Sequence, residues 1–104
     1  MFICRLIYNY LFPPLKRQSI PKKTRDTLWY NYHGTSNYGV CYACGDSLQK
    51  KNFHCSHVVP HCKGGTIQLN NIRPCCQNCN LRCGKKNLYD FIKQNKLKGP
   101  GSRK

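Results

Sequence analysis

Residues 53–80, FHCSHVVPHCKGGTIQLNNIRPCCQNCN, decide the fold of this 104-residue chain. The segment begins with aromatic and β-branched side chains and then reaches a proline, which predicts a short strand over residues 53–59. A glycine pair then favours a turn, because glycine accepts a positive φ at no steric cost. Residues 66–69 are expected to form a second strand, which Asn70, Asn71 and Pro74 end. A short helix is expected to start at Cys76. The segment therefore predicts a β-hairpin followed by a helix.

Three side chains of the same segment, an imidazole and two amides, follow one another in a fixed order. His57, Asn71 and Asn80 stand 14 and then 9 residues apart, and a hairpin followed by a helix could gather them around one metal ion. Further landmarks accompany them: Pro60, Gly64-Gly65, Asn71-Ile72-Arg73-Pro74, Cys79-Asn80 and residues 84–92. Together these features resemble the HNH endonucleases, and in particular the small zinc-containing HNH proteins of large viruses and phages.

The resemblance covers roughly residues 21–95 and implies an α+β fold class, a small zinc-stabilised ββα-metal (HNH, or His-Me finger) domain with flanking helices. It also implies a site that cuts phosphodiester bonds, with three catalytic residues. His57 is expected to be the general base, and Asn80 a metal ligand through its amide oxygen. Asn71 is expected to hold the hairpin loop or to orient the base. Imidazole suits a general base because its ordinary pKa of ~6.5 leaves much of it neutral at pH 7.

One position departs from the family pattern. Many members have an aspartate directly before the histidine, as a second metal ligand, and here the residue is Ser56. Alternate residues of a strand face the same way, so His54 is the candidate for the missing ligand. Its alternatives are to cap the strand or to contact phosphate. A catalytic metal held by Asn80, His54 and Ser56 is expected to be a divalent ion (Mg²⁺, Mn²⁺ or Ni²⁺), with imidazole favouring the latter two.

Four of the nine cysteines form two Cys-x-x-Cys pairs, Cys41 with Cys44 and Cys76 with Cys79. Two such pairs predict a tetrahedral structural Zn²⁺ site, and Cys75 fits the second pair less well than Cys76 does. An odd cysteine count argues against a disulfide framework, so we expect a reducing, intracellular compartment (cytoplasm or nucleus, or the host cell for a viral protein). The remaining cysteines are expected to be small buried apolar residues: Cys4, Cys55, Cys62 and Cys83.

The charge balance indicates a polyanionic partner. The chain has 18 Lys and Arg against three Asp and no Glu, a net charge of +15. The positive charges repel one another, and a phosphate backbone would neutralise them, so DNA is the expected partner and RNA is an option. The alternative is a basic protein that is merely very soluble or that associates with the ribosome. Arg73 would either meet a phosphate or brace the fold. The candidate nucleic-acid-binding residues are Lys63, Arg73, Arg82, Lys85 and Lys86.

The rest of the chain divides into three parts. Residues 1–18 are an apolar, then proline-rich and basic arm, residues 19–97 are the HNH nuclease domain, and residues 98–104 are a flexible basic tail. The arm has about a dozen apolar residues, fewer than the ~20 that a membrane span needs. One helix is expected between Ser19 and Gly34. A second helix is expected to begin after Asn87, which would be its N-cap.

Two features near the predicted first helix bear on nucleic acid. Lys22, Lys23 and Arg25 lie in its first turns, where the helix dipole disfavours cations, which weakly indicates a role facing phosphate. Four tyrosines could stack on bases, although packing in the core is the simpler role. They are Tyr30, Tyr32, Tyr38 and Tyr42.

The sequence thus predicts a metal-dependent HNH endonuclease that hydrolyses phosphodiester bonds in DNA, with no small-molecule cofactor. An alternative is a catalytically inactive, zinc-stabilised nucleic-acid-binding module, since Ser56 replaces an acid. A weaker alternative is a basic zinc-ribbon adaptor that docks on a ribosome or polymerase. The oligomeric state does not follow from the sequence.

Overall fold

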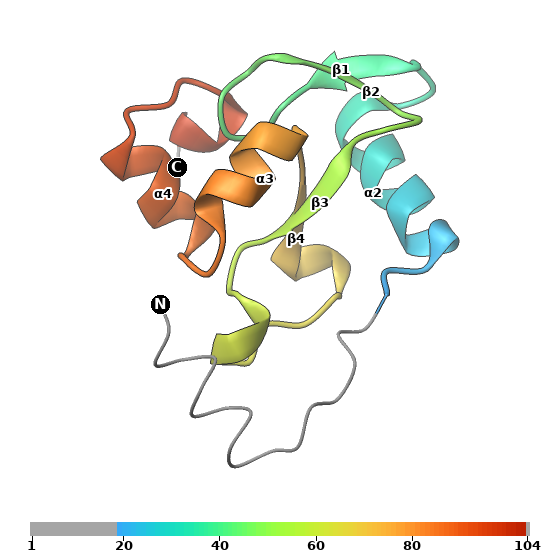
Figure 1. Ribbon diagram of the computed structural model, residues 1–104. Helices are drawn as coiled ribbons and strands as arrows, with labels where there is room; N and C mark the ends of the chain where they lie inside the picture. The colour runs from blue at the N-terminus through green and yellow to red at the C-terminus, as the bar shows by residue number, and fades with distance from the viewer. Residues whose placement is uncertain (1–18, 104) are drawn as a thin grey trace.

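A short antiparallel hairpin lies at the centre of the computed structural model, which describes residues 19–103 (Figure 1). Its strands are β3 (His54–His57) and β4 (Ile72–Cys75), with His54 opposite Cys75 and His57 opposite Ile72. The prediction of a second strand at residues 66–69 was wrong. A 3-10 turn at Leu69–Asn71 delays the strand, and β4 accommodates Pro74 because it pairs with β3 alone.

Within residues 19–103, three α-helices surround this hairpin. Helix α2 (Lys22–His33) follows Pro21 and ends at Gly34, whose φ of 62° suits glycine, as the sequence predicts. Helix α3 (Gln77–Cys83) comes directly after β4, and α4 (Leu88–Gln94) completes the set. The predicted N-cap of α4 is confirmed, because the Asn87 side chain accepts bonds from two backbone N–H groups of the first turn. In Figure 1, α2 and α4 lie on opposite sides of the hairpin.

A second hairpin, which the sequence did not predict, encloses the first cysteine pair. Strand β1 (Tyr38–Val40) pairs with β2 (Ser47–Gln49), with Gly39 opposite Leu48. The indole N–H of Trp29 donates to the Ser36 carbonyl oxygen at 2.7 Å and ties this hairpin to α2. Strands of three residues are too short to show an alternating pattern, which explains why they are not visible in the sequence.

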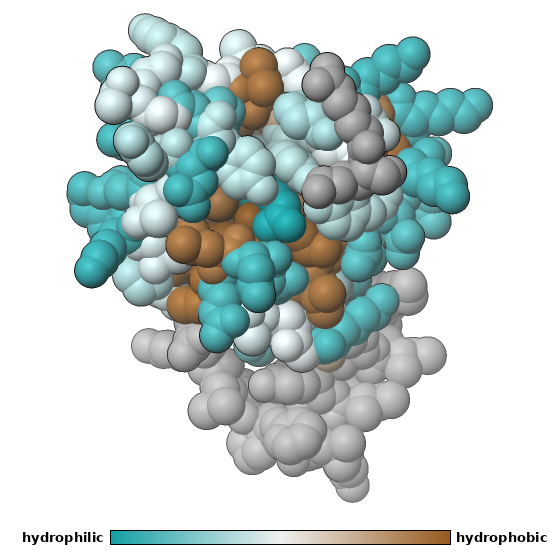
Figure 2. Space-filling model, turned by 180° about the vertical axis from the view of Figure 1, so that it is seen from behind, coloured by the Kyte–Doolittle hydropathy of each residue, from teal (hydrophilic) through white to brown (hydrophobic). Residues whose placement is uncertain are grey.

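The apolar core is small and is built around Trp29, which is fully buried. The Trp29 ring packs at 5.0 Å, centroid to centroid, against Phe53, just before β3, and Ile72 and Phe91 are buried in the same cluster. Cysteines of both Cys-x-x-Cys pairs, which we call the first knuckle (Cys41 and Cys44) and the second knuckle (Cys76 and Cys79), belong to that cluster as well. Hydrophilic side chains surround a limited apolar group on the face seen in Figure 2. A core of this size is marginal on its own, and small domains of this kind often gain stability from a bound metal or from disulfides.

The segment expected to be a flexible tail is packed against the first knuckle as far as the structure describes it. The N–H groups of Gly99 and Gly101 donate to the carbonyl oxygens of Ala43 and Tyr42 at 2.9 and 2.8 Å. A Cβ atom at Gly99 would stand 2.6 Å from the Ala43 carbonyl oxygen, so only glycine permits this approach.

The predicted N-terminal arm, residues 1–18, lies outside the described residues. Over the part of the chain that is described, no helix is long and apolar enough to cross a membrane.

Candidate metal centre and catalytic site

Four cysteine side chains converge where the β1–β2 hairpin meets α3. The Sγ atoms of Cys41, Cys44, Cys76 and Cys79 all lie within 4.8 Å of one another, and Cys76 rather than Cys75 completes the set. Backbone N–H groups point at the sulfurs: those of Cys44 and Cys76 lie 3.5 and 3.3 Å from Cys41 Sγ, and that of Cys79 lies 3.4 Å from Cys76 Sγ. Four sulfur donors with N–H support can hold a metal ion, and this donor set suits tetrahedral Zn²⁺.

The acidity of these thiols depends on burial and on their neighbours. Burial raises the pKa of the Cys44 thiol to about 12, and burial also raises the pKa of Cys79. A hydrogen bond with the Cys75 side chain lowers the pKa of Cys41 to about 4. A cation in this cluster must therefore displace protons from sulfur, which makes its binding weaker at low pH.

A second group of polar side chains lies between β3 and α3. The Ser56 hydroxyl donates to Asn80 Oδ1 at 2.8 Å, and Asn80 Nδ2 lies 3.4 Å from His54 Nδ1. Ser56 is buried, with 2% of its surface exposed, whereas His54 and Asn80 are half-buried. The pleat of β3 turns residues 54 and 56 toward the same helix, as expected from their spacing. The three residues predicted to hold the catalytic metal are thus neighbours.

The amide oxygen of Asn80 keeps coordinating capacity in this arrangement. A carbonyl oxygen has two lone pairs, and the Ser56 hydroxyl uses one of them. The imidazole of His54 and the hydroxyl of Ser56 add two further neutral donors. The group contains no carboxylate, so its affinity for a hard cation depends on neutral ligands alone.

Replacing Ser56 by aspartate tests this point. We expect Ser56→Asp to lower stability by about 1–3 kcal/mol in buffer without added divalent cations, because a buried carboxylate lacks a partner there. Added Mg²⁺ should reverse the loss and bind at least roughly tenfold more tightly than to the wild type, because ligand charge governs the affinity of hard cations. Thermal melts with increasing Mg²⁺ measure both effects. Ser56→Asn is the matched uncharged control, and equal responses of the two variants to Mg²⁺ would contradict the assignment.

Asn71 closes the loop of the central hairpin. Its Oδ1 accepts the Val59 N–H at 2.9 Å, while its Nδ2 donates to the carbonyl oxygens of Val59 and Thr66 at 3.1 and 2.9 Å. Its backbone oxygen also accepts the Val58 N–H at 2.8 Å. These bonds fix the chain immediately after His57, the last residue of β3, which is half-buried and stands opposite Ile72. Asn71 therefore holds the loop, the first of its two expected roles.

Replacing Asn71 by alanine removes three side-chain hydrogen bonds from that loop. At a net ~0.5–1.5 kcal/mol for each bond, we expect Asn71→Ala to lower the free energy of unfolding by about 2–3 kcal/mol. Urea denaturation measures the loss. Asn70→Ala changes the exposed neighbour, whose backbone oxygen accepts a bond from Arg73, and should leave the midpoint nearly unchanged. Similar midpoints for the two variants would argue against the structural role of the Asn71 amide.

The predicted nucleic-acid-binding residues have different surroundings. Arg73 is half-buried, donates to the Ile72 carbonyl oxygen at 2.8 Å and lies 5.6 Å from the Tyr42 ring centroid, which favours the bracing role. Arg82 donates to Asn95 Oδ1 at 3.2 Å and so links α3 to the end of α4. Lys63 and Lys86 are exposed and Lys85 is half-buried.

Arg25 is a positioning residue that the sequence did not single out for the site. Its Nη2 donates to the Phe53 carbonyl oxygen at 3.0 Å, and its guanidinium carbon lies 4.4 Å from the Phe53 ring centroid. Its Nη1 also reaches the sulfur of Cys55 at 3.8 Å. Arg25 therefore holds the two residues that flank His54. The only hint in the sequence was a cation in the first turns of a helix, where it opposes the dipole.

The fold and the two groups of side chains define a small α+β domain with a four-cysteine cluster that can hold a metal ion and a polar site at a hairpin–helix junction. The family model described as HNH endonuclease matches residues 41–96, which is more than half of the chain. The chain therefore belongs to the HNH endonuclease family, as its landmarks predicted. The family is one of nucleases, so nucleic acid is the class of substrate. A comparison with curated proteins finds no matching relative.

Proposed function

We propose that the protein is a metal-dependent endonuclease that hydrolyses phosphodiester bonds in DNA. The single observation that carries this proposal is that His54, Ser56 and Asn80 lie together on and against the strand that ends at His57, in a chain of the HNH family. A net charge of +15 supports a polyanionic substrate.

His57 is proposed as the general base, which accepts a proton from the attacking water. A positioned base of this kind contributes typically ~10²–10⁴-fold to a rate. Asn71 supports it indirectly, since its hydrogen bonds fix the backbone on the next two residues, Val58 and Val59. Arg25 braces the same strand on both sides of His54, through Phe53 and Cys55.

The catalytic cation fits the neutral donor set that the structure assembles. Asn80 Oδ1, a ring nitrogen of His54 and the Ser56 hydroxyl would hold it, and imidazole with amide ligands favours Mn²⁺ or Ni²⁺ over Mg²⁺. When bound, such an ion supplies charge neutralisation at the phosphate and the leaving oxygen. The cysteine cluster is proposed to hold a separate, structural Zn²⁺. Four free cysteines in one cluster fit a reducing intracellular compartment, in a cell or in the host of a virus or phage. Cys62 differs from the expectation for it, because it is disulfide-bonded and half-buried and is not a buried free thiol.

A nicking assay on supercoiled plasmid tests the proposal. The protein is incubated with Mg²⁺, Mn²⁺ or Ni²⁺ in turn, alongside Asn80→Ala, which keeps the cysteine cluster and removes the amide ligand. We expect nicking that depends on the added ion and is lost in the variant. If the plasmid stays intact with every cation, the proposal is wrong.

A second candidate function is a zinc-stabilised module that binds nucleic acid without cutting it. It is favoured by Ser56, which leaves the site without a carboxylate. In that case the protein would bind DNA with a steep dependence on salt, since binding releases counterions, and every metal would leave the plasmid intact. The nucleic acid would then be a binding partner that is not cleaved, and RNA should be tested alongside DNA.

A further inference from the structure

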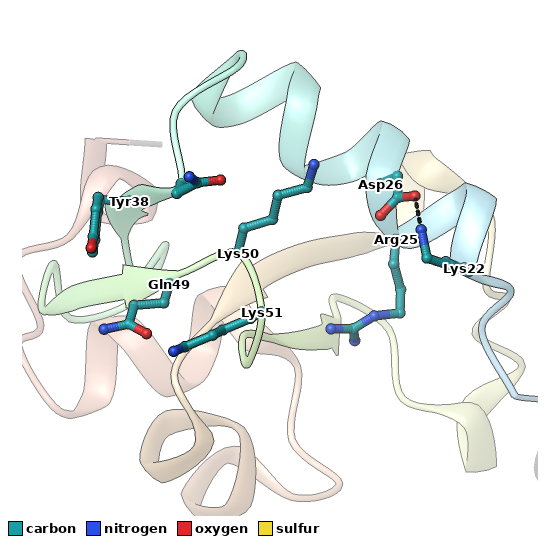
Figure 3. Close-up of a pocket in the computed structure, with 8 residues that line it drawn as sticks. Lys22, Arg25, Asp26, Tyr38, Gln49, Lys50 and Lys51 are labelled. Atoms are coloured by element: carbon teal, nitrogen blue, oxygen red, sulfur yellow. Dashed lines mark hydrogen bonds and ion pairs between the residues drawn. The ribbon is translucent and has the colours of Figure 1, made fainter.

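An open groove runs between helix α2 and the β1–β2 hairpin, with a volume of about 560 Å³ (Figure 3). Figure 3 shows Lys50 extending from the hairpin toward α2, and Arg25 extending from α2 into the space between the two. The family resemblance accounts for none of these residues, and the groove lies outside the two sites described above. The side chains that line it include Lys22, Arg25, Asp26, Tyr38, Lys50 and Lys51.

The groove is strongly basic. It combines four cationic side chains with one carboxylate, Asp26, which is already paired with Lys22 at 2.9 Å. That bond, first of all, lowers the pKa of Asp26, and the charges of Lys50 and Arg25 add to the effect. The first turns of α2 also contribute the positive end of a 12-residue helix dipole to the same space. Cations gathered in this way repel one another, so an anionic ligand would stabilise them.

An aromatic ring stands at the edge of this basic groove. Tyr38 has 68% of its surface exposed and lines the groove, whereas Tyr42 is buried in the core. Because every base has a π-face, an exposed ring beside a track of cations is the combination that binds single-stranded nucleic acid without a sequence preference. A paired duplex keeps its bases stacked and would leave the Tyr38 ring unused.

The groove leads directly to the proposed catalytic strand. Lys51 precedes His54 by three residues, so their Cα atoms lie within roughly 11 Å of each other. Arg25, on the other wall, holds Phe53 and Cys55 on either side of His54. Even at the ~3.4 Å per charge of one strand in a stacked duplex, a few nucleotides span such a distance, and an unpaired strand reaches at least as far.

We propose that this groove binds an unpaired stretch of the nucleic-acid strand next to the cleaved bond, with its phosphates on the four cations and one base stacked on Tyr38. The inference rests on the proposed function because it assumes a nucleic-acid substrate, but it concerns binding and does not require cleavage.

Fluorescence anisotropy with a labelled single-stranded oligonucleotide tests it, in buffer without added catalytic cation and over a series of salt concentrations. We expect Lys50→Gln/Lys51→Gln to weaken binding by roughly tenfold or more and to lower the slope of log affinity against log salt by about 1.4, or ~0.7 for each lost phosphate contact. The matched control is Lys93→Gln/Lys96→Gln, which removes the same charge from exposed positions in and after α4, on the other side of the molecule. Equal losses in the two double variants would overturn the proposal.

The Tyr38 ring is tested separately from charge. Tyr38→Ala should weaken single-strand binding by at least about fivefold, while Tyr38→Phe keeps the stacking surface and should bind as the wild type does. A duplex of the same sequence should bind less tightly and show no difference between wild type and Tyr38→Ala. Tighter binding of the duplex, or no effect of Tyr38→Ala on the single strand, would overturn the proposal. Failure of the nicking assay alone would sink the proposed nuclease and leave this binding pattern intact.

Discussion

Replacing Cys79 by serine is expected to unfold the domain at ordinary temperature. The Cys79 side chain is 1% exposed, belongs to the apolar core and is one of the four cysteines that join the β1–β2 hairpin to α3. A structural zinc ion contributes on the order of 10 kcal/mol of apparent folding free energy. A whole domain is stable by only about 5–15 kcal/mol, so losing one ligand removes most of what holds this one together.

Circular dichroism and zinc content, measured on the same sample, check this expectation. The matched control is Cys83→Ser, one turn further along α3, where the thiol is also buried and donates to the Lys86 carbonyl oxygen at 3.4 Å. The control should melt cooperatively with one zinc ion per chain, while Cys79→Ser and chelator-treated wild type should lack a cooperative transition. If the Cys79→Ser protein melts like the wild type, the proposal of a structural zinc ion is wrong.

The second large effect is expected from His57→Ala. Nicking of supercoiled plasmid in the preferred cation should fall by ~10²–10⁴-fold, because the proton of the attacking water has no positioned acceptor. The fold should survive, since His57 lies at the end of β3 and belongs neither to the apolar core nor to the cysteine cluster. The measurement is the initial nicking rate, together with the melting temperature and the affinity for uncleaved DNA.

His61→Ala supplies the comparison for that experiment. His61 opens the 3-10 turn that follows Pro60, four residues beyond the proposed base, so the variant loses an imidazole from the same loop region. We expect it to nick at close to the wild-type rate. If both variants cut at the wild-type rate, the proposed base is wrong, whereas equal loss in both would assign the effect to general damage of the loop.

Parts of this fold could be predicted because single residues carry strong local signals. The N-cap at Asn87 and the glycine after α2 mark helix ends through backbone chemistry that acts within one turn. The cysteine cluster followed from two Cys-x-x-Cys pairs of fixed spacing, and the placement of His54 and Ser56 on the face of β3 that meets Asn80 followed from the pleat of one strand. Each of these inferences starts from a pattern within one helix end, one strand or one Cys-x-x-Cys pair.

The remainder depends on contacts between distant segments. Strand β4 begins at Ile72 because the Asn71 side chain bonds across the loop to Val59, and nothing within residues 66–69 signals that bond. The bracing role of Arg25 needs Phe53 and Cys55, which are remote in the sequence. Arg73 could not be assigned from its neighbours alone, because its guanidinium meets the Tyr42 ring.

The bonds that Gly99 and Gly101 make to the first knuckle bear on how the protein forms in the cell. During synthesis, the carbonyl groups of Tyr42 and Ala43 leave the ribosome long before the N–H groups of Gly99 and Gly101 do. Until then, these oxygens must accept hydrogen bonds from water. The four cysteines can already gather once α3 has emerged, but the knuckle acquires its full set of hydrogen bonds only after residues 99–101 follow. Folding of this domain is therefore completed after most of it has been translated.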